Sequence, residues 1–212
     1  MADYAVYDER YRMVAEQAGT LDELLPHYVR DFIALERKSE ELLRELLLRG
    51  RYRIFTVRSR ETGTCAAYLM GYPVEGDQYF FLDFFAVDPA FRGGGLGAWT
   101  LRTLSGLLGV DGLFFELEIP GEDAEPEDQS VRRIGFYERL GACRLPVEYA
   151  LLLGDGSLFP MYFYYLPFTA GMPERVSVKE AITVTFDYTY GVMPAAYPQW
   201  RQTLVAILGT VG

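Results

Sequence analysis

A glycine-rich turn between two predicted elements constrains the fold of this chain more than any other feature. The aromatic and apolar segment Tyr79–Val87 predicts a strand, and a leucine stripe from about Ala98 to Leu108 predicts a helix. Between them runs Arg92-Gly93-Gly94-Gly95-Leu96-Gly97. Glycine permits positive φ and a close approach of backbone amides, and the amides at a helix N-terminus attract anions. The turn therefore predicts a cradle for a pyrophosphate.

Several nucleotide-binding folds use such a cradle, and the residues around the turn narrow the choice. A Walker A loop requires Lys-Ser/Thr after its last glycine, but Ala98 and Trp99 stand there. A Rossmann fingerprint has its glycine turn near the first βα unit, whereas this turn lies mid-chain behind a mainly antiparallel first half. For the turn taken alone, a glycine-rich connection that binds nothing remains an alternative.

The segments around the turn predict strands and helices in one domain without internal repeats. Because Gly112–Ile119 also has the pattern of a strand, the strand, helix and strand around the turn form a βαβ unit with a parallel pair. Two further helices open with a capping-box pattern, at Thr20–Glu23 and at Ser177–Glu180. The other predicted elements are a helix over Leu35–Leu48, a hairpin of Tyr52–Val57 with Cys65–Met70, a loop over Pro73–Gln78, a helix over Val131–Leu140, a hairpin of Arg144–Leu153 with Leu158–Leu166, and helices over Val178–Tyr190 and Trp200–Leu208.

Length, charge and composition exclude several classes of protein. The 212 residues suit a single domain with an ordinary core, and the net charge of −10 argues against binding of nucleic acid. The N-terminal residues lack the apolar run of a signal peptide, and no segment reaches the roughly 18 apolar residues of a membrane helix. Cys65 and Cys143 lie far apart, which favours free thiols in a reducing cytoplasm. His27 is the only histidine, and no cluster has metal-ligand spacing, so we expect no metal.

Two motifs follow each other in a characteristic order. Arg92–Gly97, preceded by Phe85–Pro89, fits the pattern Arg/Gln-x-x-Gly-x-Gly, and Phe136–Ala142 is similar to the pattern Phe-Tyr-x-x-x-Gly-Phe. With a helix and a strand between them, the two motifs resemble the signatures of the GNAT superfamily of acyl-CoA-dependent N-acyltransferases. The resemblance covers roughly Tyr52 to Leu166, and residues 176–212 form a helical extension beyond the common core.

The resemblance implies an α+β fold of the GNAT type, with a mixed central sheet that splays at the acetyl-CoA site and helices on both faces. Acetyl-CoA would lie between the strand Tyr79–Val87 and the strand Gly112–Ile119, and an N–H of Val87 would serve as the oxyanion donor. The implied cofactor-binding residues are Phe85, Ala86 and Val87 for the pantetheine arm, Arg92, Gly93, Gly94, Gly95, Leu96 and Gly97 for the pyrophosphate, and Arg133 as a further contact.

The resemblance also implies catalytic roles. Tyr137 matches the superfamily tyrosine that protonates the departing CoA thiolate. The incoming amine must lose a proton, and three carboxylates interrupt otherwise apolar strands: Glu118, Asp83 and Glu116. Glu118, near its strand end, is the first choice as general base, and Asp83 is the second. Structural ion pairs with Arg132, Arg133 or Arg139 are the alternative for any one of them.

The acceptor is defined only by class. We expect a primary amine of a small molecule or peptide, attacking the thioester directly because neither cysteine has a histidine partner nearby. The acidic loop Glu122–Asp128 would border the acceptor side, and Asp128-Gln129-Ser130 departs from the asparagine that many relatives carry there. A non-catalytic acyl-CoA-binding or sensory domain, a longer acyl chain and an alcohol acceptor remain alternatives. We expect no membrane partner, and a homodimer is possible through the strand Met161–Tyr165 and the C-terminal tail.

Overall fold

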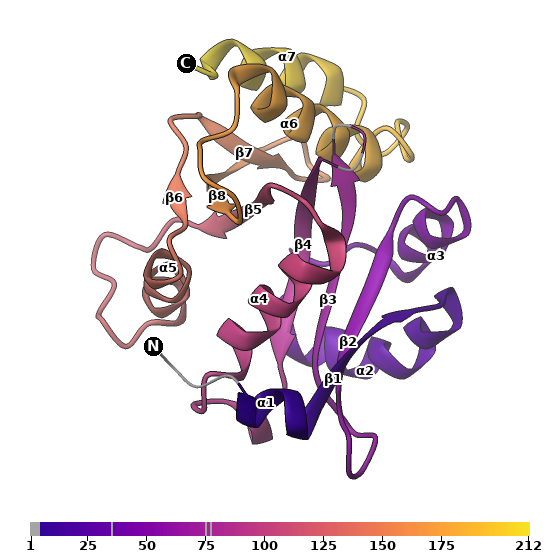
Figure 1. Cartoon of the computed structure of the whole chain (residues 1–212). Coiled ribbons are helices and arrows are strands. Elements are labelled where there is room, and N and C mark those ends of the chain that lie inside the picture. The colour runs from indigo at the N-terminus through magenta and orange to yellow at the C-terminus, as the bar shows by residue number, and fades with distance from the viewer. Residues whose placement is uncertain (1–4, 35, 75, 77) are drawn as a thin grey trace. The chain divides into compact units, whose positions relative to one another are not determined.

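Two long strands, β3 (Cys65–Val74) and β4 (Tyr79–Val87), run through both of the units into which the chain divides (Figure 1). The computed structural model describes residues 5–34, 36–74, 76 and 78–212. The first unit holds the described residues up to Tyr72 together with Leu82–Gly109. The second holds those of Pro73–Phe81 together with Val110–Gly212.

The first unit is a sheet with helices on both faces. β1 pairs antiparallel with β2, and β2 pairs antiparallel with β3, which lies beside β4. Successive residues of β2 point to opposite faces: Val57 packs with Trp99 of α4, whereas Arg58 forms an ion pair with Glu23 of α2. Besides β3 and β4, its elements are α1 (Ala5–Arg10), β1 (Tyr11–Glu16), a 3₁₀ turn (Ala18–Thr20), α2 (Leu21–Asp31), α3 (Glu40–Leu48), β2 (Arg53–Ser59), a 3₁₀ turn (Pro89–Phe91) and α4 (Leu96–Leu108).

The second unit is built on the strand that follows α4. Tyr79–Phe81 of β4 pairs in parallel with Gly112–Phe114 of β5, and β5 pairs antiparallel with β8. β8 in turn pairs antiparallel with both β6 and β7. Its elements are β5 (Gly112–Glu118), α5 (Gln129–Arg139), β6 (Cys143–Arg144), β7 (Tyr149–Leu152), β8 (Leu158–Pro167), α6 (Arg175–Thr189) and α7 (Trp200–Thr210).

Aromatic side chains attach helices to the two faces of β5. The Phe115 ring packs against the tilted ring of Tyr137 of α5, with centroids 4.3 Å apart. The next residue, Glu116, points to the opposite face and accepts a hydrogen bond from Tyr149 of β7. The Tyr149 ring in turn contacts Phe186 of α6. Parallel and antiparallel pairs thus occur together, and the predicted α+β class with a mixed sheet and helices on both faces is confirmed.

Both predicted capping boxes are wrong, because neighbouring residues change the local structure. Thr20 closes a 3₁₀ turn with helical backbone angles, and its hydroxyl donates to Glu16 at 3.2 Å instead of capping α2. Ser177 lies inside α6, which begins at Arg175, and its side chain is buried. The capped N-terminus occurs instead at α3, where the Ser39 hydroxyl accepts from the Leu42 N–H.

Several element boundaries also differ from the prediction. The helix predicted from Leu35 begins at Glu40, and Leu35 itself lies outside the described residues, as do positions 75 and 77 of the predicted loop Pro73–Gln78. The predicted strand Arg144–Leu153 is divided into β6 and β7 around Pro146, which has no N–H to donate to a ladder. Neither α1 nor β1 is predicted from the sequence. No helix of the described residues has the length and apolar character needed to cross a membrane.

Candidate functional site

The predicted phosphate cradle is a left-handed glycine turn at the start of α4. Gly93 has φ +86° and Gly95 has φ +93°, a region that L side chains rarely occupy. Gly95 is the N-cap of α4, and the first helical hydrogen bond runs from the Trp99 N–H to the Gly95 carbonyl at 3.1 Å. The N–H groups that precede Trp99 in the first turn of a helix have no acceptor within the helix. The turn therefore directs several backbone donors toward one place.

The segment between β4 and the turn is tied down at both ends. Asp88 accepts a hydrogen bond from the Ala90 N–H at 3.0 Å, which caps the 3₁₀ turn, and its own N–H donates to the Ala66 carbonyl of β3. Arg92 donates from Nε to the Val87 carbonyl at 2.8 Å, so its side chain folds back on the end of β4. These contacts fix the approach of the chain to Gly93.

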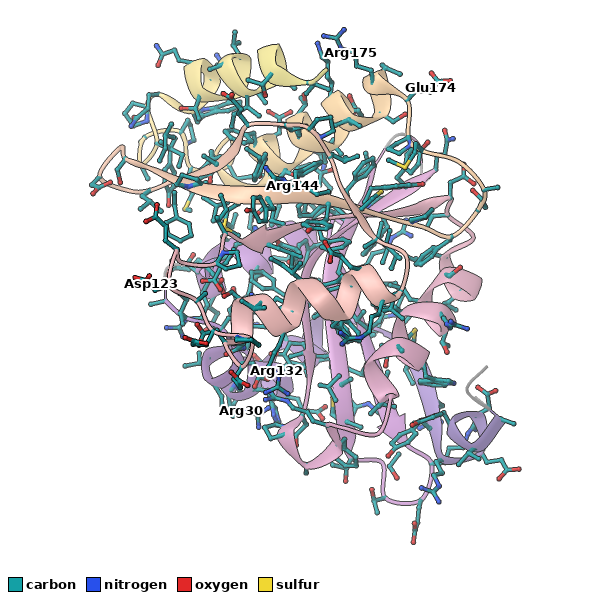
Figure 2. All side chains as sticks on the ribbon, turned by 90° about the vertical axis from the view of Figure 1, so that its left-hand side faces the viewer. Arg30, Asp123, Arg132, Arg144, Glu174 and Arg175 are labelled. Carbon is teal, nitrogen blue, oxygen red and sulfur yellow. The ribbon has the colours of Figure 1, made fainter. Side chains whose placement is uncertain are left out.

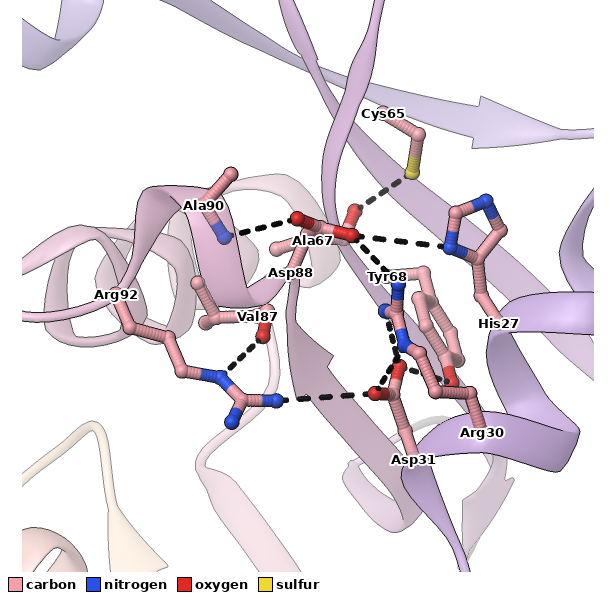
Figure 3. A network of polar contacts seen from close by, with 10 residues as sticks. All are labelled: His27, Arg30, Asp31, Cys65, Ala67, Tyr68, Val87, Asp88, Ala90 and Arg92. Atoms are coloured by element: carbon pink, nitrogen blue, oxygen red, sulfur yellow. Dashed lines mark hydrogen bonds and ion pairs between the residues drawn. The ribbon is translucent and has the colours of Figure 1, made fainter.

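A network of charged groups from α2 extends this anchoring (Figure 3). Asp31, whose side chain is 4% exposed, accepts two hydrogen bonds from Arg30, each of 2.9 Å. Its carboxylate also accepts from the Tyr68 hydroxyl of β3 and lies 3.7 Å from Nη2 of Arg92. Arg30 also donates to Asp88 at 2.9 Å. The sequence did not predict this network, because residues 31 and 92 are far apart along the chain.

Asp83 is paired within its own unit. Nζ of Lys38 lies 2.8 Å from its carboxylate, and the Tyr52 hydroxyl donates to the same group. The Lys38 and Asp83 side chains are 8% and 9% exposed, and burial together with the Asp83 charge raises the pKa of Tyr52. The arginines of α5 were the expected ion-pair partners, and for Asp83 the partner is instead Lys38. A buried, fully paired carboxylate favours a structural role over that of a proton acceptor.

Tyr137 lies in the second unit, where its ring is held between neighbours. It packs at a tilt against Phe115 and contacts the ring of Phe136 edge-on at 5.0 Å. Burial raises the pKa of the Tyr137 hydroxyl, and the charge of Arg133, one helical turn earlier, opposes this shift. The hydroxyl therefore keeps its proton well into the alkaline range. Its role as an acid stays a prediction.

The two glutamates of β5 have different partners. Glu116 accepts a hydrogen bond from the Tyr149 hydroxyl. Glu118 lies 3.8 Å from Nη1 of Arg133, and both side chains are about a quarter exposed, at 26% and 28%. Glu118 therefore lies near one of the α5 arginines that were predicted as alternative ion-pair partners. Arg133, predicted as a cofactor contact, lies beside this carboxylate.

An open hollow of about 530 Å³ adjoins Glu118 on the surface of the second unit. Figure 2 shows Asp123 on the loop that contributes to it and Arg132 on the following helix α5. Carboxylates dominate the hollow and favour a cation over an anion there. Its lining residues are Glu118, Gly121, Glu122, Asp123, Ala124, Asp128, Gln129 and Ser130.

The cysteines do not have the surroundings of a nucleophile. Both are free thiols. Burial raises the pKa of Cys65 to about 11 and also raises the pKa of Cys143. Thiols held in the protonated form are weak nucleophiles. Among the residues that the structure describes, no group of three or more His, Cys, Asp or Glu side chains could hold a metal ion.

The predicted site residues are divided between the two units. The first unit contains Asp83, Phe85, Ala86, Val87 and the turn from Arg92 to Gly97. The second contains Glu116, Glu118, Arg133 and Tyr137. Each set is ordered by contacts within its own unit: the ion-pair network in the first, and the aromatic packing on Phe115 in the second.

The comparisons with known proteins agree on one family. The family model described as the acetyltransferase (GNAT) family matches residues 21–142, which is more than half of the chain. This match includes the glycine turn and Tyr137. The chain therefore belongs to the GNAT acetyltransferase family. No curated protein gives a significant match.

Solved structures show the same fold. A GNAT-family protein from Bacteroides thetaiotaomicron is 22% identical with a TM-score of 0.65, over 83% of this chain and 96% of its own. A GNAT-family protein from Desulfovibrio desulfuricans is 22% identical with a TM-score of 0.54, over 75% of this chain and 99% of its own. A variant of a spermidine N-acetyltransferase from Vibrio cholerae is 14% identical with a TM-score of 0.52, over 74% and 94%.

The backbone of the turn predicts a contrast between two glycines of α4. Gly95→Ala should lower the free energy of unfolding by about 1–2 kcal/mol, because alanine is strained at a positive φ. Gly106→Ala is the matched control, since its Cβ would meet no atom within 4 Å and an exposed helical glycine gains up to about 1 kcal/mol on this change. Urea denaturation measures both. Equal stability of Gly95→Ala and the wild type would contradict a left-handed requirement at this position.

A second prediction concerns pH. Burial alone would raise the pKa of Asp88, but the Ala90 N–H and Arg30 outweigh it, so the pKa lies below its ordinary value. Ionised Asp88 therefore stabilises the folded state above the unfolded pKa of about 4, and this contribution is lost as the pH falls through the folded pKa. Asp88→Asn should be less stable than wild type at neutral pH, and the difference should close in acid. A difference that stays constant down to strongly acidic pH would contradict the charge interaction.

Proposed function

We propose that this protein transfers an acetyl group from acetyl-CoA to a primary amine of a small molecule or peptide, by direct attack of the amine on the thioester. The observation that carries the proposal is the left-handed glycine turn at the N-terminus of α4, in a chain whose family model spans this turn. Backbone donors gathered at a helix N-terminus are suited to a pyrophosphate. Because the chain belongs to the GNAT acetyltransferase family, we propose that this pyrophosphate is the one of CoA.

Arg92 supports the cofactor half of the proposal. Its side chain is 55% exposed, and its Nε is held by the Val87 carbonyl, so its charge is fixed beside the turn. Backbone amides and one arginine can bind phosphates in a protein that is acidic overall. The backbone of Phe85, Ala86 and Val87 leads directly into this segment and is our proposed partner for the pantetheine arm.

The chemistry requires little covalent help from the protein. The amine nitrogen forms a bond to the thioester carbon, the C–S bond breaks, and the CoA sulfur leaves as a thiolate that then takes up a proton. Positioning the two reactants supplies much of the rate enhancement. A CoA thiol has a pKa near that of cysteine, about 8.5, well below that of the buried Tyr137 hydroxyl. Tyr137 therefore acts chiefly as a hydrogen-bond donor that stabilises the leaving thiolate.

The amine must first give up a proton. Glu118 is our choice of acceptor, because Asp83 is buried in an ion pair with Lys38 and Glu116 is bound by Tyr149. Glu118 is partly exposed and lies at the end of β5, where the guanidinium of Arg133 is 3.8 Å away. It also lines the acidic hollow, whose charge favours the approach of a protonated amine.

A non-catalytic acyl-CoA-binding domain is the second candidate, favoured by the buried ion pair that occupies Asp83. The two candidates make different predictions for one experiment, in which acetyl-CoA is incubated with a panel of primary amines. An acetyltransferase releases CoA thiol only when a suitable amine is present. A binding domain holds acetyl-CoA but releases no thiol with any amine.

The role of Tyr137 predicts a specific loss of turnover. Tyr137→Phe should lower kcat by about 10- to 100-fold, the value of a hydrogen bond to a charged group, while leaving the affinity for acetyl-CoA unchanged. Tyr164→Phe is the matched control, because Tyr164 also stacks on Phe115 but donates its hydroxyl to Glu138. Steady-state thiol release and calorimetry measure the two quantities. An unchanged kcat in Tyr137→Phe would rule out this role.

The role of Glu118 predicts a pH-dependent loss. Glu118→Gln should lower kcat by about 10²-fold at neutral pH, where the amine is protonated. The loss should shrink as the pH approaches the pKa of the amine, about 10 for an alkylamine, because a neutral amine needs no acceptor. Glu116→Gln should show no such recovery. A pH-independent loss in Glu118→Gln, or recovery in Glu116→Gln alone, would reject Glu118 as the proton acceptor.

A further inference from the structure

The short N-terminal helix α1 brings a tyrosine hydroxyl to the glycine turn. A Cβ placed on Gly95 would lie 3.2 Å from the Tyr7 hydroxyl oxygen, and one placed on Gly94 would lie 3.6 Å from it. Tyr7 and the turn both belong to the first unit. The hydroxyl therefore lies directly beside two glycines in the middle of the proposed pyrophosphate cradle.

Contacts with α4 and β1 hold Tyr7 in this place. Its ring stacks on Trp99 at 6.2 Å and on Tyr11 at 6.3 Å between centroids. The following residue, Asp8, accepts a hydrogen bond from Nε1 of Trp99 at 3.0 Å. Arg60 donates from Nε to the carbonyls of Asp8 and Tyr11. The helix is thus fixed to α4 through Trp99 and to the β2–β3 hairpin through Arg60.

Gly94 also lies beside Tyr7. Gly93 and Gly95 have positive φ, whereas Gly94 does not and could carry a side chain on conformational grounds alone. A branched or longer side chain at Gly94 would project toward the Tyr7 hydroxyl and occupy the space between it and the turn. The Tyr7 hydroxyl thus lies close to the backbone of the turn. Backbone amides and a hydroxyl that lie close together are suited to an anion.

We propose that Tyr7 is a further cofactor-binding residue, whose hydroxyl donates a hydrogen bond to the pyrophosphate of the acyl-CoA held by the glycine turn. The inference rests on the proposed function for the identity of the ligand. Arg92, the charged group of the turn, already divides its donors between the Val87 carbonyl and the vicinity of Asp31. The Tyr7 hydroxyl adds a neutral hydrogen-bond donor to the cradle on the side of α1. The carboxylate of the next residue, Asp8, accepts a hydrogen bond from Trp99.

The test compares two tyrosines and two ligands. Tyr7→Phe removes the hydroxyl and keeps the ring stack, and Tyr11→Phe does the same within the same aromatic cluster. Calorimetry is run with acetyl-CoA and with acetyl-pantetheine, which lacks the pyrophosphate. Tyr7→Phe should weaken acetyl-CoA binding by about tenfold, the scale of one hydrogen bond to a charged group, and leave acetyl-pantetheine binding unchanged. Tyr11→Phe should leave both unchanged.

Each other outcome overturns the inference in a distinct way. If wild type binds acetyl-CoA and Tyr7→Phe binds it equally well, the contact is absent while the proposed function stands. If Tyr7→Phe weakens both ligands to the same extent, or lowers the melting temperature relative to Tyr11→Phe, the residue has a structural role only. If wild type binds no acetyl-CoA, the proposed function and the contact fail together.

Discussion

The left-handed backbone of Gly93 and Gly95 is the constraint on which the rest of this structure depends. It ends the connection from β4 and places Gly95 at the N-cap of α4, so that the first amides of the helix follow directly on the glycine turn. Only glycine adopts these angles without strain. The anion-binding property follows from this geometry, because the amides at a helix N-terminus lack partners within the helix.

Two different kinds of packing support the two sets of site residues. In the first unit, the support comes from charged side chains. Arg30 and Asp31 of α2 contact Asp88 and Arg92 in the segment that leads to the turn. The side chains of Asp31 and Asp88 are only 4% and 20% exposed. In the second unit, the support comes from aromatic rings. Phe115 packs against Tyr137, and burial keeps the Tyr137 hydroxyl protonated. The charged network fixes the direction of the arginine donors. The packed rings fix the position of the Tyr137 hydroxyl among apolar neighbours.

Local signals made much of the fold predictable from the sequence. The strands of the βαβ unit, both hairpins and the two C-terminal helices were predicted from local composition and turn residues, and the two motifs identified the family. The capping boxes failed because a four-residue pattern ignores tertiary competitors: Glu16 of β1 takes the Thr20 hydroxyl. β1 itself was missed because its residues are identified as a strand only by their pairing with β2, from Glu16 with Ile54 to Tyr11 with Ser59.

The candidate site was less predictable than the fold for the same reason. Motifs located the turn and Tyr137, but the partners of Asp83 and Arg92 come from residues far away in sequence, Lys38 and Asp31. Tyr7 belongs to no motif, and only the packing of α1 on Trp99 brings it to the turn. Pairwise geometry of this kind is set by the folded chain, and spacing along the sequence carries no signal for it.

The most direct test of the account follows the acetyl group itself. Acetyl-CoA labelled with ¹³C at the carbonyl is incubated with the protein and a primary amine, and the label is traced by NMR while free thiol is titrated. If the protein is an acetyltransferase, the label appears as an amide of the amine, with one CoA thiol released for each amide formed. Label that remains in protein-bound acetyl-CoA, with no amide from any amine in the panel, would contradict it.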